Sequence, residues 1–285
     1  MLAGLKINLS LRVGERRADG FHELATVLAA LPLGDSLELE PAAVTRVDAP
    51  GLPAGDGLVT RALTLLAERA RHGAGWRVQI DKRTPVGAGL GGGSADAGAA
   101  LRLANATLPE PLGAGELLAV AAAVGSDVPF FAAGRACALA RGRGEALEPC
   151  TLGAEAWAAL AWPGAELSTA QVYAAYRPPG LASARLAELA AAPFAVAGVE
   201  QLAALVENDL AAPAERLCPR AASLRAALGA AGALVACVSG SGSAVFGLFA
   251  SEDAAESARE RVAGGARWTG VARLPQGTAA ATIPV

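Results

Sequence analysis

Alternating apolar and polar residues near the N-terminus predict a β-strand over residues 5–13. Successive side chains of a strand point to opposite faces, so Leu5 and Ile7 share one face while Lys6 and Asn8 share the other. A polar face of this kind is usually solvated, but it could equally line a substrate site. Similar patterns predict further strands over residues 33–39, 76–81, 134–144, 158–163 and 270–274.

Apolar residues at helical spacing and runs rich in Ala and Leu predict helices between these strands. The predicted helices cover residues 59–70, 97–105, 116–124, 167–173, 216–228 and 252–262. A chain of 285 residues can bury one large core or two modest ones, and we expect two domains. The boundary near Pro149 gives domains of residues 1–149 and 150–285, and the last predicted strand could return to the first domain.

Composition excludes several classes of protein. Of all residues 53% are hydrophobic, but most are small and only 4% are aromatic. Residues 226–250 carry no charge, yet alternating serines and glycines interrupt them, so we expect no membrane span there. A net charge of −3 gives no basic surface for nucleic acid. The N-terminus lacks the apolar core of a signal peptide, and we expect a cytoplasmic protein.

The four cysteines are Cys137, Cys150, Cys218 and Cys237, and no two of them form a C-x-x-C pair. Scattered cysteines in a chain without a secretion signal are more often buried thiols than disulfides or zinc ligands. We therefore expect all four to be free, in a reducing compartment.

The most informative stretch is the glycine-rich segment of residues 85–96, which has five glycines within seven residues. It connects the predicted strand 76–81 to the predicted helix 97–105, for which Ser94 or Asp96 could serve as N-cap. Glycines let backbone N–H groups approach an anion closely, and a helix N-terminus adds its positive end. A flexible turn is the alternative, but this context favours a phosphate-binding loop.

Three familiar nucleotide-binding loops do not fit this segment. A Walker A loop needs a lysine after its last glycine, whereas Ser94 follows Gly93 here. The dinucleotide pattern G-x-G-x-x-G is present, but Arg77 and Gln79 make the preceding strand too polar for a central parallel strand. The His-Arg-Asp and Asp-Phe-Gly motifs of protein kinases are missing.

The string Pro-x-Gly-x-Gly-Leu-Gly-Gly-Gly-Ser resembles the ATP-binding loop of the GHMP kinases, a superfamily that includes galactokinase, homoserine kinase and mevalonate kinase. The resemblance implies a two-domain α+β GHMP kinase fold, with an ATP-binding, ribosomal protein S5 domain 2-like N-terminal domain and a substrate-side C-terminal domain. It also implies ATP as cofactor, with Mg²⁺ carried by ATP and no dedicated protein-only metal site. The residues it assigns to ATP binding are Lys82, Pro85, Gly87, Gly89, Leu90, Gly91, Gly92, Gly93 and Ser94.

Two further segments match motifs of the same superfamily. The Lys-x-Asn of the first strand matches an active-site motif, so the resemblance makes Lys6 catalytic and Asn8 substrate-binding. The string Gly-Ser-Asp-Val-Pro at residues 125–129 matches the motif of the catalytic aspartate, here Asp127. By itself, Asp127 would more usually cap the turn before Pro129.

A second glycine-rich loop, Ser239-Gly240-Ser241-Gly242, would be a hairpin turn if taken alone. It matches the third GHMP motif, which lies near the phosphates and supports the wall of the active site. One position departs from the family pattern. An asparagine near the adenine usually begins the helix predicted at 59–70, and this sequence has Gly57 there.

Two segments are similar to the branch of GHMP kinases whose substrate carries a cytidine diphosphate group. Phe21 and His22 follow Asp-Gly as in the cytidine-binding segment of that branch, and the Ser-Thr-x-x-x-Tyr string places Thr169 and Tyr173 at the substrate. A core aromatic is the equally weighted alternative for Tyr173.

The resemblance therefore implies an ATP-dependent kinase acting on a hydroxyl of a small cytidine diphosphate compound, in the non-mevalonate route to isoprenoids. Two alternatives stay open: a GHMP kinase for homoserine or mevalonate, and a nucleotide-binding regulator that has lost catalysis. We expect a monomer or a weak homodimer.

Overall fold

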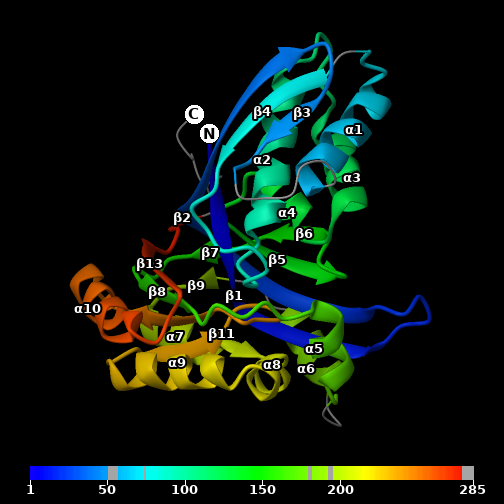
Figure 1. Ribbon diagram of the computed structural model, residues 1–285. Coiled ribbons are helices and arrows are strands. Elements are labelled where there is room, and N and C mark those ends of the chain that lie inside the picture. The colour runs from blue at the N-terminus through cyan, green and yellow to red at the C-terminus, as the bar shows by residue number, and fades with distance from the viewer. Residues whose placement is uncertain (51–56, 74, 179–181, 192–194, 278–285) are drawn as a thin grey trace.

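Two long strands run through the structure and carry much of the candidate site. The computed structural model describes residues 1–50, 57–73, 75–178, 182–191 and 195–277. In it, β1 (Leu2–Arg16) pairs antiparallel with β2 (His22–Ala42) along most of its length. Both strands extend from the upper part of the molecule to a hairpin at the lower right of Figure 1.

The alternation predicted for β1 is confirmed. Leu5, Ile7 and Leu9 are fully buried in an apolar core, and burial of each such side chain contributes roughly 1.5–3 kcal/mol. The polar face is buried too, since Lys6 is 4% and Asn8 5% exposed. A buried ammonium is tolerated only with hydrogen-bonding partners, which indicates a built polar site on this face.

The larger sheet contains seven of the described strands, in the order β10-β1-β2-β4-β3, with β5 and β6 attached through β2. Its further members are β3 (Arg46–Asp48), β4 (Gly75–Asp81), β5 (Cys137–Gly142), β6 (Ala146–Pro149) and β10 (Glu207–Asn208). Four helices pack on one face of this sheet (Figure 1). They are α1 (Leu58–Ala70), α2 (Gly92–Thr107), α3 (Ala114–Val124) and α4 (Val128–Ala132).

The second sheet has the order β11-β12-β8-β13, and all its neighbouring strands are antiparallel. Its strands are β8 (Trp157–Trp162), β11 (Val235–Val238), β12 (Val245–Phe249) and β13 (Trp268–Arg273). Two helices, α9 (Pro219–Ala230) and α10 (Glu252–Ala263), share an apolar core with this sheet. The last predicted strand, β13, pairs with β8 in this sheet.

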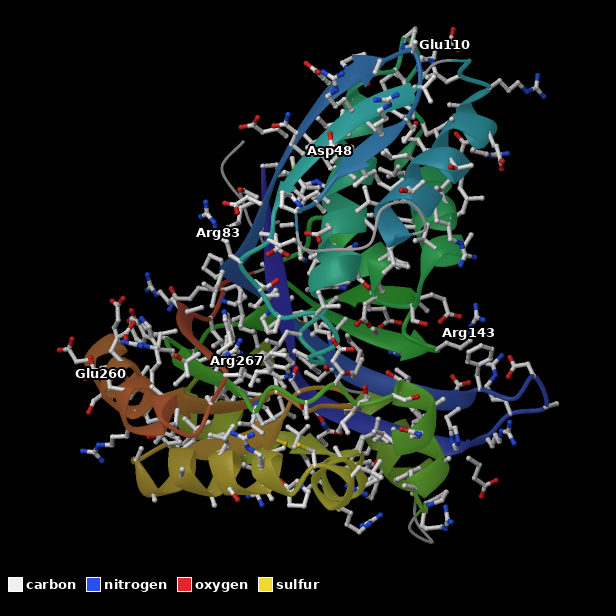
Figure 2. The ribbon with its side chains drawn as sticks, in the orientation of Figure 1. Asp48, Arg83, Glu110, Arg143, Glu260 and Arg267 are labelled. Carbon is white, nitrogen blue, oxygen red and sulfur yellow. A yellow bond between two sulfur atoms is a disulfide. The ribbon has the colours of Figure 1, made fainter. Side chains whose placement is uncertain are left out.

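Smaller elements complete the described part of the second half. They are β7 (Thr151–Leu152), α5 (Thr169–Ala175), α6 (Ala182–Ala191), β9 (Ala195–Val196), α7 (Val199–Leu205) and α8 (Ala211–Leu217). β7 and β9 form a parallel pair. β10 instead joins the larger sheet, parallel to β1, so the second half of the chain contributes a strand to the sheet of the first half. Charged side chains such as those of Asp48, Glu110 and Glu260 lie exposed on the outside of the molecule (Figure 2).

The start of α2 differs from the prediction. We expected Ser94 or Asp96 as N-cap, but the helix begins at Gly92 and its N-cap is Gly91, with no side chain capping the terminus. Gly91 has a φ of 76°, which an L side chain rarely adopts, so the backbone leaves the loop through a left-handed residue. The glycine run is therefore part of the helix terminus itself.

The prediction of four free cysteines is wrong for one pair. Cys137 on β5 and Cys150 just after β6 are joined as a disulfide, with Cα atoms 5.8 Å apart. The antiparallel β5–β6 hairpin brings them together, since it pairs Ala138 with Pro149. Cys218 and Cys237 are free and buried, as expected.

The uncharged segment 226–250 consists of the end of α9, the strand β11, a loop and the strand β12. Among the described residues, no helix has both the length and the apolar character needed to cross a bilayer.

Candidate active site

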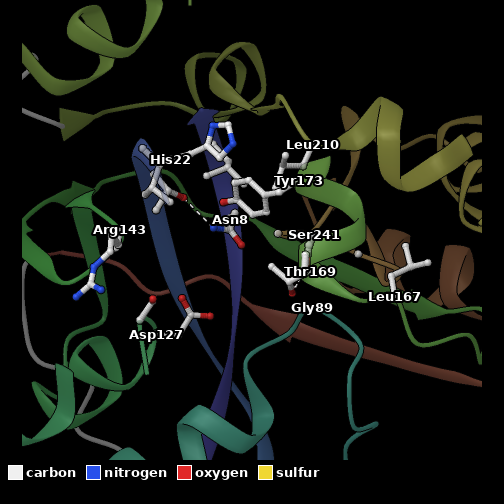
Figure 3. A pocket seen from close by; sticks show the side chains of 18 of the residues that line it. Asn8, His22, Gly89, Asp127, Arg143, Leu167, Thr169, Tyr173, Leu210 and Ser241 are labelled. Atoms are coloured by element: carbon white, nitrogen blue, oxygen red, sulfur yellow. Dashed lines mark hydrogen bonds between the residues drawn. The ribbon is translucent and has the colours of Figure 1, made fainter. Parts of the chain in front are cut away.

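A cavity of about 1520 Å³ lies where the two glycine-rich loops meet β1. Its wall includes residues 85–89 and 91–94 of the first loop and residues 240–242 of the second. Figure 3 shows Asp127 and Arg143 on one side of β1, and Thr169 and Ser241 on the other. The cavity thus joins side chains from both halves of the chain.

The first glycine loop offers backbone donors to this cavity. The first N–H groups of any α-helix lack acceptors within the helix, and no side chain caps α2. Gly92, Gly93 and Ser94, at the start of this helix, all line the cavity. An anion with several oxygens fits such a terminus, because donors and the helix dipole act together.

Close contact between the two glycine-rich loops explains why a glycine is needed at position 89. Gly89 has a φ of 84°, and a Cβ added there would lie 2.6 Å from the carbonyl oxygen of Ser239. The Ser239 hydroxyl donates to the Gly89 carbonyl oxygen at 3.1 Å, and the Ala244 amide donates to the Ala88 carbonyl oxygen at 2.9 Å. The second loop therefore supports the first through backbone contacts.

Lys6 and Asp127 are brought together from opposite ends of the first half. The Lys6 Nζ lies 3.5 Å from Asp127 Oδ2, and it donates to Asn8 Oδ1 at 2.7 Å and to the Gly89 carbonyl oxygen at 3.1 Å. The Lys6 side chain is only 5% exposed, whereas that of Asp127 is 37% exposed. The ammonium is thus fixed at the edge of the loop, and the carboxylate faces the open cavity.

Asn8 is oriented by a short chain of hydrogen bonds. Its Nδ2 donates to the Thr26 hydroxyl at 2.8 Å, and that hydroxyl donates to the Ser10 carbonyl oxygen at 2.7 Å. These bonds leave the amide oxygen of Asn8 to accept from Lys6. Thr26 is a residue that sequence reasoning missed, because no strand was predicted over the first half of β2.

His22 and Tyr173 lie together at another part of the cavity. Their ring centroids are 5.3 Å apart with a tilt of 38°, and Tyr176 meets His22 edge-on at 6.1 Å. The His22 Nδ1 is 2.9 Å from the Gly14 carbonyl oxygen, to which a protonated Nδ1 donates. Burial, followed by the nearby charge of Asp127, raises the pKa of Tyr173 to about 12. The aromatic group therefore lies close to the catalytic candidates.

Phe21 has a different environment. It is 51% exposed, and the guanidinium of Arg143 lies 5.0 Å from its ring centroid. Both side chains line the cavity. Sequence reasoning did not single out Arg143 or Tyr176 as site residues. The motifs identified Phe21 and Tyr173, which lie beside them. Only the fold shows that the β5–β6 turn, which carries Arg143, faces Phe21.

The remaining substrate and support candidates meet at the second loop. Thr169 Oγ1 lies 3.0 Å from Ser241 Oγ. Asn208 on β10 donates from Nδ2 to the Gly240 carbonyl oxygen at 2.8 Å and to the Val238 carbonyl oxygen at 2.9 Å. β10 therefore holds this loop in place from the edge of the larger sheet.

Two predicted ATP-binding residues lie outside the cavity lining. Leu90 is 1% exposed, and its carbonyl oxygen accepts from the Lys6 amide at 2.9 Å. Lys82 is not among the residues that line the cavity, and its ammonium pairs with two carboxylates, Asp35 and Asp96. The other predicted site residues, except Ser239, line the cavity directly, and Ser239 is fully buried behind it.

Comparison with known proteins agrees with this arrangement. The model of the GHMP kinases N terminal domain matches residues 57–135, and that of the GHMP kinases C terminal domain matches residues 195–266. A 4-diphosphocytidyl-2-C-methyl-D-erythritol kinase from Desulfotalea psychrophila is 39% identical over 259 residues, which are 87% of this chain and 85% of the relative. The chain belongs to the GHMP kinases.

Solved structures of GHMP kinases differ in how similar they are to this chain. The crystal structure of a 4-(cytidine 5'-diphospho)-2C-methyl-D-erythritol kinase superposes with a TM-score of 0.76 at 38% identity, covering 95% of this chain and 98% of that one. A mevalonate kinase from L. major has a TM-score of 0.70 at only 16% identity, with coverage of 98% and 96%, and so shares the fold alone. This GHMP kinase therefore has the two-domain α+β fold that the motifs predicted.

Proposed function

We propose that this GHMP kinase transfers the γ-phosphoryl group of ATP to the 2-hydroxyl of 4-diphosphocytidyl-2-C-methyl-D-erythritol, a step of the non-mevalonate route to isoprenoid precursors. The observation that carries the proposal is the position of Lys6, 3.5 Å from Asp127 and 3.1 Å from the Gly89 carbonyl oxygen of the phosphate-type loop. The relatives named for this substrate cover most of the chain.

The glycine loop is suited to ATP. The backbone N–H groups of Gly92, Gly93 and Ser94 would hold the phosphates at the start of α2. The exposed Leu58 and Val86 also line the cavity and offer apolar surface for the adenine, in the absence of a side-chain amide at Gly57.

The charge of the cavity lining suits two substrates that each carry several phosphate charges, ATP and the cytidine diphosphate compound. The described cavity lining holds four cationic side chains, Lys6, Arg16, Arg143 and Arg177, against two anionic ones, Glu15 and Asp127. The described residues form no cluster of three or more His, Cys, Asp or Glu side chains that could hold a metal ion. When bound, ATP supplies the phosphoryl group, and the Mg²⁺ it carries neutralises charge on the phosphate oxygens.

The cytidine end of the substrate would lie at His22 and Tyr173, with Phe21 and Thr169 on the surrounding wall. Aromatic rings contribute stacking area, and hydrogen-bonding groups read the edge of the base. A substrate without a nucleobase, such as homoserine or mevalonate, has no use for this group of rings.

The chemistry falls to Asp127, Lys6 and Asn8. Asp127 orients the attacking hydroxyl and accepts its proton as the oxygen bonds to the γ-phosphorus and the bond to the β–γ bridging oxygen breaks. Lys6 stabilises the negative charge that develops on the transferring oxygens. Asn8 holds Lys6 in position and approaches the same hydroxyl. A regulator without activity would not need both Lys6 and Asp127.

Turnover with purified protein tests the proposal. Release of ADP is measured with 4-diphosphocytidyl-2-C-methyl-D-erythritol, homoserine or mevalonate as acceptor, and the product is identified by phosphorus NMR. We expect ADP and a monophosphorylated product in equal amounts with the first acceptor only. Turnover of homoserine or mevalonate at a similar rate would favour another GHMP activity. ATP binding without turnover of any acceptor would favour the regulator.

A further inference from the structure

A buried group of charges lies behind the glycine loop, outside the cavity lining. It consists of Asp35 on β2, Lys82 just after β4 and Asp96 in the first turns of α2. Asp35 is 0% exposed, and the side chains of Lys82 and Asp96 are 10% and 4% exposed. We call these three residues the Asp35–Lys82–Asp96 cluster.

The cluster connects both ends of the loop. Lys82 precedes Pro85 by three residues, and Asp96 follows Ser94 by two. The Lys82 ammonium donates to Asp96 Oδ2 at 2.8 Å and also to Asp35 Oδ2. Lys82 therefore joins the chain entering the loop to the helix leaving it, much as a cross-link would.

Asp35 fixes the entry to the loop by its own hydrogen bonds. Its Oδ1 accepts from the backbone amides of Arg83 at 2.7 Å and of Thr84 at 3.0 Å, and its Oδ2 accepts from the Thr84 hydroxyl at 2.8 Å. A Cβ added to Gly92 would lie 3.0 Å from that Thr84 hydroxyl and 3.8 Å from Asp35 Oδ2. The cluster thus lies close to Gly92, the first residue of α2, which lines the cavity.

Stability alone is a poor explanation for this arrangement. Two carboxylates share one ammonium, and Asp96 Oδ1 is buried without a hydrogen-bond partner among the described residues. Burial raises the pKa of Asp96 to about 6, against the opposing effect of Lys82. Burial also disfavours the Lys82 ammonium, but Asp96 and Asp35 outweigh it and leave the Lys82 pKa above its ordinary value. Buried ion pairs of this kind often stabilise less than apolar side chains of equal size would.

We propose that the Asp35–Lys82–Asp96 cluster is a positioning device for ATP, which holds the two ends of the glycine loop so that the α2 N-terminus is preformed for the phosphates. The inference rests on the proposed use of this loop for ATP. Lys82 then acts on ATP affinity without touching ATP. A loop held in its binding conformation loses less entropy when the ligand binds, and affinity rises accordingly.

Direct binding measurements test the cluster independently of turnover. Calorimetry gives the Kd of Mg²⁺–ADP and of cytidine diphosphate for the whole chain and for D96N, K82M and K82R. We expect D96N and K82M to weaken Mg²⁺–ADP binding by roughly tenfold and K82R by less, with cytidine diphosphate binding unchanged. At saturating ATP, kcat should change by less than about threefold, because Lys6 and Asp127 are untouched.

A matched control separates positioning from general destabilisation. Arg225 pairs with Glu215 between α9 and α8, outside the cavity lining, so R225M breaks an ion pair without touching the loop. We expect R225M to lower Tm and leave both Kd values unchanged.

Three results would overturn the positioning role. D96N could bind Mg²⁺–ADP within about twofold of the wild type. Both ligands could weaken equally in D96N, or R225M could weaken Mg²⁺–ADP as much as D96N does. If K82M does not fold, D96N decides the question, because it keeps the shape of the side chain. A wild-type chain that binds Mg²⁺–ADP but does not turn over the substrate would refute the proposed function and leave the role of the cluster intact.

Discussion

The two lysines beside the glycine loop are both buried, yet their surroundings differ. Among the described residues, Lys6 meets a single carboxylate, that of Asp127, whose side chain is 37% exposed and lines the cavity. Lys82 meets two carboxylates, Asp35 and Asp96, which are closed off from solvent. An open ion pair leaves a carboxylate free to meet a substrate, whereas a closed one can only hold parts of the protein. The difference shows that closeness to the glycine loop does not by itself leave the ion pair of a lysine open to the cavity.

The largest effect is expected at the open pair. Asp127→Asn keeps the size of the side chain but removes the proton acceptor, so kcat should fall roughly a hundredfold or more with Tm nearly unchanged. Steady-state kinetics and a thermal melt measure the two quantities. Glu110→Gln, on an exposed residue distant from the cavity lining, is the control for loss of one charge. An Asp127→Asn variant that retains most of its kcat would make the Lys6–Asp127 pair a structural contact.

The next effect concerns the glycine loop that lies between the two lysines. Gly89→Ala places a Cβ 2.6 Å from the Ser239 carbonyl oxygen at a φ of 84°, so the two loops must separate. We expect the KM for ATP to rise roughly tenfold or more. Gly115→Ala is the control, because Gly115 lies outside the cavity lining and a Cβ added there has no neighbouring atom within 4 Å among the described residues. Equal KM values for the two variants would contradict the role of loop contact.

A smaller and more selective effect is expected at the aromatic group. His22→Ala should raise the KM for the cytidine substrate roughly tenfold and leave the KM for ATP unchanged, because it removes a ring that lies 5.3 Å from Tyr173. The other histidine provides the control, since His72 stacks on Trp76 outside the cavity lining. A His22→Ala variant that weakens both substrates to the same extent would argue against a separate cytidine site.

The smallest expected effect is a dependence of the stability on pH, caused by Asp96 of the Asp35–Lys82–Asp96 cluster. With its pKa raised to about 6, the folded chain holds the Asp96 proton more tightly than the unfolded chain does. Asp96 thus contributes stability that is fully present below about pH 4 and is lost as pH rises through about 6, up to roughly 3 kcal/mol. Asp35 and Lys82 are the charged groups that face it.

Thermal melts of the wild type and Asp96→Asn at several pH values check this linkage. As pH falls from 7 to 4, the wild type should gain stability relative to Asp96→Asn, because only the wild type takes up the extra proton. A Tm difference that does not change with pH would show that Asp96 has an ordinary pKa.

Sequence motifs predicted the parts of the site that local chemistry determines. Lys6, Asp127 and the glycine loop could be named because each lies in a short string of matching residues. The surroundings of Lys82 could not, since its partner Asp35 lies 47 residues away and only the pairing of β2 with β4 brings them together. The Cys137–Cys150 disulfide could not be predicted for the same reason, because only the β5–β6 hairpin brings together two cysteines that are 13 residues apart in the sequence.

The extent of β2 was underestimated for a different reason. Only residues 33–39 showed a clear alternation, whereas the strand covers His22–Ala42. Residues 24–31 are buried on both faces of the sheet. Helices α1 to α4 cover one face, and the apolar core that contains Leu5, Ile7 and Leu9 covers the other, so these residues are apolar or small almost throughout. A strand buried on both faces has no period of two to detect. Thr26 was overlooked with it.

The short strand β10 makes the two halves of this chain mutually dependent. Cutting the backbone between Cys150 and Thr151 would leave the first fragment with an unpaired edge along β1, where Ser10 and Leu11 now meet Glu207 and Asn208. The second fragment would keep Asn208, but without the sheet that orients it toward the second loop. We expect neither piece to fold alone, because the core around Leu5, Ile7 and Leu9 contains side chains from both. To reconstitute the kinase from two polypeptides, both would have to be expressed together. Because the cavity is lined by residues of both halves, ligand binding would appear only when the two fragments associate.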